Sequence, residues 1–135
     1  ETFLRAYRAL PMFDPNGSAK LSTWLLTIAT NLSFDERRRR RPNVELDEAK
    51  NFPASDTPER AHDRTQLRDA LERAARDLPD DQCAALVLAE FHGQPLREIA
   101  EILGVPESTV KTRLFRAREK MKVSLHEFRT AGSRP

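Results

Sequence analysis

The sequence predicts an all-α protein made of two small helical domains joined by a flexible linker. Apolar residues recur at three- and four-residue spacing through most of the 135 residues, which is the pattern of amphipathic helices. Breaks rich in proline, glycine and serine separate these runs, and none of the runs alternates as a strand would. A charged fraction of 33% with an aromatic fraction of 7% suits helical modules with thin cores better than one large globule.

The first predicted helix spans residues 1–12. Its apolar residues Phe3, Leu4, Tyr7 and Leu10 fall on one face, away from Arg5 and Arg8. So short a helix needs partners for that face to be stable. Neither a capping residue nor an initiator methionine precedes it, so the first domain is expected to be partial, with its preceding helices missing.

A break at residues 11–22, with two prolines and an Asn-Gly pair, precedes a long helix that Ser22 is expected to cap. The expected buried stripe of this helix is Trp24, Leu25, Ile28, Ala29, Leu32 and Phe34. Five consecutive arginines, residues 37–41, end it. They suit the negative end of the helix dipole, but five exceed that need, so the favoured interpretation is contact with nucleic-acid phosphates.

Residues 42–58 are interpreted as the linker, because they hold three prolines, scattered acids and few large apolar side chains. They divide the chain into a first domain of residues 1–41 and a second domain of residues 59–135. The second domain is expected to begin with a helix over 59–77, whose inward residues are Leu67, Ala70, Leu71, Ala74 and Ala75. A helix over 82–92 follows, capped by Asp80 or Asp81 and ended by Gly93, and a frayed tail is expected from Phe128 onward.

Residues 95–121 carry the pattern of a helix-turn-helix. Leu96, Ile99, Ala100 and Leu103 form the apolar stripe of a first helix, and Gly104 then supplies the left-handed residue that ends it. Pro106 stands where a second helix can begin, with Ser108 or Thr109 as its cap. The buried side of that second helix is predicted to comprise Val110, Leu114, Ala117 and Met121.

The other side of the second helix is strongly basic. Its polar residues are Lys111, Thr112, Arg113, Arg116, Arg118, Lys120 and Lys122, with Glu119 as the single acid among them. A helix fits the major groove of B-DNA, where arginine and lysine read guanine edges and neutralise phosphates. The sequence therefore predicts DNA binding by this helix. An ordinary solvated basic face is the alternative.

Composition excludes several other functions. The single cysteine, Cys83, rules out an internal disulfide, lies in an apolar run typical of a core, and fits a reducing cytosol. No apolar run approaches a membrane span and no signal peptide is recognisable, so a cytoplasmic protein without membrane insertion is expected. Three scattered histidines and the lack of a glycine-rich phosphate loop argue against an enzyme, a metal site or a cofactor.

The chain resembles the extracytoplasmic-function class of bacterial RNA polymerase sigma factors of the sigma-70 family. Residues 1–10 resemble the end of region 2.2, residues 21–40 resemble regions 2.3 and 2.4, and residues 78–121 resemble region 4. The resemblance implies a partial sigma-2 domain and a complete sigma-4 domain. It also implies binding to the β′ clamp and β flap of core RNA polymerase, recognition of the −35 and −10 elements of promoter DNA, and control by an anti-sigma factor.

The resemblance assigns roles to particular residues. For the major groove of the −35 element they are Ser108, Thr109, Lys111, Thr112, Arg113, Arg116 and Arg118, with Lys111, Thr112 and Arg113 expected nearest the base edges. For the −10 element they are Phe13, Asp14, Ser18, Lys20 and Asn31, around a flipped base, together with Arg37, Arg38 and Arg39. For the polymerase clamp they are Glu1, Arg5 and Arg8.

One other class of function is consistent with the helix-turn-helix alone. A stand-alone transcriptional regulator, of the response-regulator output type, would carry the same motif without needing polymerase. Such a protein is expected to form a dimer on a palindromic site. A sigma factor is expected instead to be monomeric when free and to gain DNA affinity on binding core polymerase.

Overall fold

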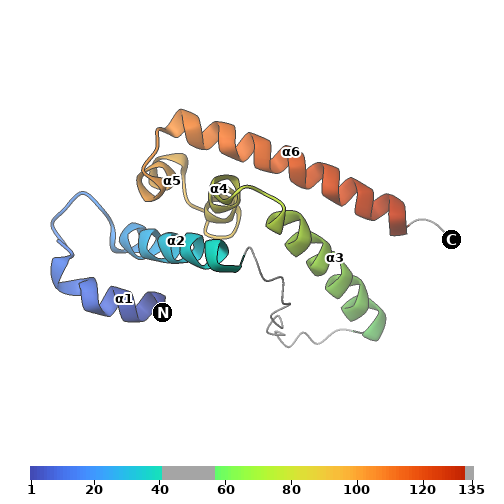
Figure 1. The fold of residues 1–135 in the computed structure, drawn as a ribbon, viewed down its shortest axis with the longest axis horizontal. Coiled ribbons are helices and arrows are strands. Elements are labelled where there is room, and N and C mark those ends of the chain that lie inside the picture. The colour runs from blue at the N-terminus through green and yellow to red at the C-terminus, as the bar shows by residue number, and fades with distance from the viewer. Residues whose placement is uncertain (41–56, 133–135) are drawn as a thin grey trace.

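A computed structural model describes residues 1–40 and 57–132, and every regular element in those two ranges is a helix (Figure 1). The prediction of an all-α fold is confirmed. In chain order the elements are α1 (Thr2–Ala9), the short 3-10 helix η1 (Leu10–Met12), α2 (Leu21–Arg40), α3 (Pro58–Arg76), α4 (Asp80–Glu90), α5 (Leu96–Leu103) and α6 (Glu107–Gly132). Within the described ranges, no helix is both long enough and apolar enough to cross a membrane.

The core of the molecule lies where α4, α5 and α6 meet. Its buried residues are Ala85, Leu88, Ile99, Ile102, Val110 and Leu114, and Ile99 and Val110 are fully buried. Figure 1 shows α4 and α5 beneath the N-terminal half of α6, while α3 converges on α6 from the side. The predicted inward positions Val110, Leu114 and Ala117 of the last helix are buried, and Met121 is half-buried.

Several predicted boundaries and caps were wrong by a few residues. The Trp24 helix begins at Leu21, so Ser22 lies inside it, and α6 begins at Glu107, ahead of Ser108 and Thr109. The N-cap of α4 is Pro79, whereas Asp80 or Asp81 was predicted to cap this helix. The tail from Phe128 was predicted to fray, but α6 continues through it as far as Gly132. The predicted linker, apart from residues 57 and 58, lies outside the described residues, as does Arg41.

The predicted apolar face of α1 is not buried. Phe3, Tyr7 and Leu10 are 84%, 77% and 50% exposed, and the helix packs on α2 through the small Ala6 instead. On α3, the predicted inward residues Leu67 and Leu71 are likewise exposed, while Ala70 and Ala74 are buried against α6. In both helices the smaller side chain makes the close contact.

Candidate nucleic-acid interface

The turn between α5 and α6 is fixed by Gly104, whose φ of 64° places it in the left-handed region. The Gly104 N–H donates to the carbonyl of Glu101 at 3.3 Å, and the Val105 N–H donates to that of Ala100 at 3.1 Å. This pair of bonds is a Schellman motif, which satisfies the last carbonyls of α5. α6 then starts after Pro106, whose carbonyl accepts bonds from the N–H groups of Thr109 (3.0 Å) and Val110 (3.2 Å).

Replacing Gly104 by alanine is expected to lower the free energy of unfolding by about 1–2 kcal/mol, the cost of a left-handed conformation with a Cβ. A Cβ at this position would meet no atom within 4 Å, so the loss comes from the backbone alone. Gly104→Asn is the control, because asparagine tolerates this region better and should cost less. Chemical denaturation measures both, and equal losses would contradict the backbone explanation.

The predicted DNA-contacting residues of α6 divide into two groups. Ser108, Lys111, Thr112 and Arg116 are exposed, on a side that also carries Phe115, itself 67% exposed. The Thr112 hydroxyl donates to the carbonyl of Ser108 at 3.1 Å, and Thr109 is half-buried. The exposed group is directly available to a groove.

The second group is engaged within the protein. The Nε of Arg113 lies 3.2 Å from Oδ2 of Asp81, and only 23% of the arginine side chain is exposed. Arg118 donates from Nε (3.1 Å) and Nη2 (2.7 Å) to one oxygen of Glu90. Both acids belong to α4, so these pairs join α6 to α4. No local pattern predicts this pairing, since Asp81 and Glu90 lie 32 and 28 residues before their partners.

The residues predicted for the −10 element are spread along α2 and the loop before it. Phe13 is half-buried, with its ring centroid 5.2 Å from that of Trp24, and Asp14 accepts a bond from the Asn16 N–H at 2.9 Å. Ser18 and Lys20 are exposed on the same loop. Asn31 is exposed but lies eleven residues beyond Lys20, roughly 16 Å along the helix at 1.5 Å per residue. The structure therefore groups the loop residues and sets Asn31 apart from them.

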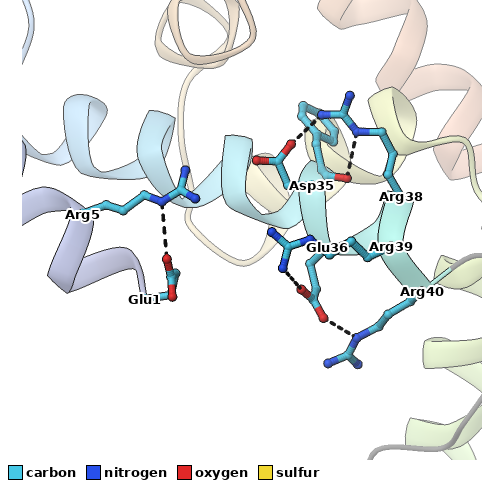
Figure 2. A network of polar contacts seen from close by, with 8 residues as sticks. Glu1, Arg5, Asp35, Glu36, Arg38, Arg39 and Arg40 are labelled. Carbon is cyan, nitrogen blue, oxygen red and sulfur yellow. Dashed lines mark hydrogen bonds and ion pairs between the residues drawn. The ribbon is translucent and has the colours of Figure 1, made fainter.

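The described arginines of the run, residues 37–40, are paired with acids. Figure 2 shows Arg38 with Asp35 (2.7 Å), and Arg39 (3.9 Å) and Arg40 (2.7 Å) with Glu36. These are exposed pairs within one helix, of the kind worth about 0–1 kcal/mol. Such pairs are exchanged for phosphate at little cost.

Arg37 is held by groups outside its own helix, from α3, the turn after it and α4. Its Nε lies 2.9 Å from Oδ1 of Asp80, and its Nη2 donates to the carbonyls of Arg76 (3.2 Å) and Leu78 (3.0 Å). Lys20, at the other end of α2, lies 3.6 Å from Glu98 of α5. Two predicted DNA-binding residues are thus held against the second part of the chain, Lys20 against α5 and Arg37 against α4.

The carboxylate of Glu98 is held by groups from the start of α2. The hydroxyl of Thr23 donates to its carboxylate at 2.6 Å. That bond lowers the pKa of Glu98, and the charges of Lys20 and Arg97 add to the effect, while partial desolvation opposes it. The carboxylate is ionised at neutral pH, and its contribution to stability is lost only as the pH falls through this lowered pKa.

The residues predicted to meet the polymerase clamp are all exposed, with Arg5 and Arg8 on α1 and Glu1 directly before it. Arg5 pairs with Glu1 at 3.5 Å across one helical turn, as Figure 2 shows, and Arg8 is solvated. They share this short helix with the uncovered apolar side chains of Phe3 and Tyr7.

The comparisons with known proteins agree with this geometry. The family model described as Sigma-70 region 2 matches residues 1–42, and that described as Sigma-70, region 4 matches residues 68–121. The chain is 36% identical to the ECF RNA polymerase sigma factor SigW of Bacillus subtilis (strain 168), over 94% of this chain and 73% of that protein. The chain belongs to the extracytoplasmic-function sigma factors. The family predicted from the sequence is confirmed.

Other relatives of this sigma factor support the same assignment. It is 37% identical to the ECF RNA polymerase sigma-E factor of Escherichia coli (strain K12), over 88% of this chain and 67% of that protein. Among solved structures it matches the sigma factor RpoE of Bartonella quintana, crystallised with the anti-sigma factor NepR. The TM-score is 0.68 at 25% identity, over 93% of this chain and 76% of that one. As a sigma factor, the protein directs promoter-specific transcription, and the stand-alone regulator is not favoured.

Proposed function

We propose that this sigma factor holds the −35 duplex with α6 and the −10 region with α2 and the loop before it, while bound to core RNA polymerase. The observation that carries the proposal is the exposed face of Lys111, Thr112 and Arg116 on the second helix of the helix-turn-helix, which follows the Schellman turn at Gly104. Residues 1–41 would form the polymerase- and −10-binding domain and 59–135 the −35-binding domain, with 42–58 as linker.

The proposed division of contacts follows the exposure of each residue. Lys111 and Thr112 would meet base edges, and Arg116 and Ser108 would hold phosphates. About half or more of the hydrogen bonds between proteins and DNA go to the phosphates and sugars of the DNA. Phe115, beside them on the exposed side, would contact a thymine methyl group. Arg113 and Arg118 would act chiefly by fixing the helix to Asp81 and Glu90 on α4.

The partners would be core polymerase, promoter DNA and an anti-sigma factor. Glu1, Arg5 and Arg8 would face the β′ clamp, and α3–α6 would meet the β flap. An anti-sigma factor is proposed because the related RpoE was crystallised with one. The sigma factor would be monomeric when free, work in the cytoplasm beside the polymerase, and carry out no reaction of its own.

Reconstitution with core RNA polymerase tests the proposal. The chain and core enzyme would be mixed, purified as a complex and used to transcribe a genomic library, and initiation at a defined promoter set is the expected result. The transcribed set would supply the −35 and −10 sequences together. A chain that fails to bind core enzyme but binds a palindromic duplex as a dimer would contradict the proposal.

Replacing Arg38 and Arg39 by glutamine is expected to flatten the salt dependence of promoter binding by the holoenzyme. The slope of log K against log salt should fall by about 0.7–0.9 for each phosphate that the variant no longer neutralises. The matched control replaces Arg68 and Arg76, which pair with Glu72 inside α3, as Arg38 and Arg39 pair with Asp35 and Glu36 inside α2. An unchanged slope in the Arg38 and Arg39 variant would show that these arginines are only solvated charges at the end of the helix and contact no phosphate.

A further inference from the structure

Two ion pairs join α4 to α6, one on each side of the apolar contact between these helices. Near the start of α4, Oδ2 of Asp81 lies 3.2 Å from Nε of Arg113. At the end of α4, Oε1 of Glu90 accepts bonds from Nε (3.1 Å) and Nη2 (2.7 Å) of Arg118. Successive residues of a helix turn by about 100°, so the two arginines lie roughly 140° apart around α6. The buried Leu114 falls between them, so the pairs flank the apolar seam.

The two pairs differ in how far water reaches them. The side chain of Arg113 is 23% exposed, whereas those of Arg118 and Glu90 are 52% and 51% exposed. Arg118 donates from both Nε and Nη2 to the carboxylate, and this edge of the guanidinium is one that a phosphate can also occupy. While the pair is closed, this edge is therefore not available to attract DNA regardless of its sequence.

Base recognition by α6 depends on the rotation of this helix about its own axis. Lys111 and Thr112 are exposed on the side proposed to meet the base edges. Groups that make such contacts must be held to within about 0.5 Å and 10–20° of the productive geometry. Burial of apolar surface is not directional, so the seam alone does not fix the rotation that closely. Two charged hydrogen-bonding pairs on opposite sides of the seam are directional and resist rotation in both senses.

We propose that Asp81 and Glu90 are positioning residues that set the sequence selectivity of −35 binding. Acting through Arg113 and Arg118, they fix the rotation of α6 and keep both arginines from phosphates. The inference rests on the proposed binding of −35 DNA by α6, and it makes Arg113 a positioning residue where the sequence predicted a base contact. Loss of the two carboxylates should lower selectivity and add phosphate contacts, a combination that a simple loss of stability would not produce.

The test measures binding of the holoenzyme to a promoter and to its −35-scrambled version at several salt concentrations. In the double variant Asp81→Asn with Glu90→Gln, the ratio of the two affinities should fall by roughly fivefold or more, the discrimination that one good base contact supplies. The salt slope should steepen by about 0.9 for each arginine that gains a phosphate. The matched control is Asp77→Asn with Glu101→Gln, which removes the same charge from two other exposed acids and should change neither quantity.

A charge swap separates positioning by Arg113 from direct contact with a base. Arg113→Asp alone places two acids against each other and should lower the affinity ratio. Adding Asp81→Arg restores a pair of opposite charges between α4 and α6, so the ratio should recover. A ratio that stays low in the swapped variant would show that the Arg113 side chain itself reads a base, and would overturn its positioning role.

Glu90→Gln alone keeps the test decisive if the double variant does not fold, because a half-exposed pair adds little to stability. An affinity ratio that is unchanged in every variant of the two acids would overturn the proposal, whatever the salt slope. A lower ratio with an unchanged slope would support positioning and refute the shielding of the arginines from phosphate. An unaltered holoenzyme that does not distinguish the two promoters would refute the proposed function of α6, and the positioning role with it.

Discussion

Val110→Ala is expected to lower the free energy of unfolding by about 2–3 kcal/mol. The side chain is fully buried in the cluster shared by α4, α5 and α6. Removing two methyl groups forfeits about 0.8 kcal/mol of burial each, and the cavity left beside Ile99 and Leu114 adds to the loss. The same change should loosen the angle between α5 and α6 and so weaken DNA binding beyond its effect on stability.

Val123→Ala provides the matched control for this prediction. It makes the same chemical change on the same helix, but Val123 is 59% exposed, so the loss should stay within about 0.5 kcal/mol. The gain in helix propensity from alanine is common to both variants and cancels in the comparison. Urea denaturation, monitored by circular dichroism, measures both losses. Equal midpoints would show that the buried side chain of Val110 does not stabilise the helix-turn-helix.

The helix-turn-helix could be predicted from the sequence because its rules are local. Gly104 ends α5 in the conformation that glycine favours, and Pro106 precedes the next helix directly. Val110, Leu114 and Ala117 share one face by spacing alone, and all three are buried. Neighbouring residues on one short segment determine these features, so no knowledge of the rest of the fold is required.

The remaining errors arise where distant segments decide the outcome. The spacing of Phe3 and Tyr7 predicts an apolar face on α1, but spacing cannot say whether anything covers it, and both residues are exposed. A row of arginines likewise indicates one basic patch, although Arg37 pairs with Asp80 across 43 residues while Arg38 pairs within its own turn. Only the packing of α2 against α4 distinguishes Arg37, which pairs with another helix, from Arg38, which pairs within its own.

Helix α6 shows the same limit at single-residue resolution. Sequence position groups Lys111, Thr112 and Arg113 as base-contacting candidates, although consecutive residues sweep most of a helix surface. The structure ties Arg113 to Asp81 and leaves the other two exposed. Truncating Arg113 would therefore remove an ion pair to α4 as well as any contact with DNA, which makes it an ambiguous probe of base recognition.

Lys111→Ala is the cleaner probe, and it is expected to weaken holoenzyme binding at a −35 site by about 1–3 kcal/mol, or roughly 5- to 150-fold. Arg116→Ala should instead weaken binding about equally at matched and scrambled −35 sequences and reduce the salt slope by about 0.9, because a phosphate carries no sequence information. Quantitative footprinting at several salt concentrations, on a promoter and its −35-scrambled version, measures both effects.

Lys122→Ala is the control for these two substitutions. It removes the same type of charge from the same helix, but about three turns beyond Lys111, where Lys122 pairs with Glu119 at 3.1 Å. Its effect on either DNA should be small, so any loss it shares with Lys111→Ala measures long-range charge alone. If Lys111→Ala lowers affinity equally for both DNAs, then Lys111 holds a phosphate, and base recognition passes to Thr112 and Phe115 on the exposed side.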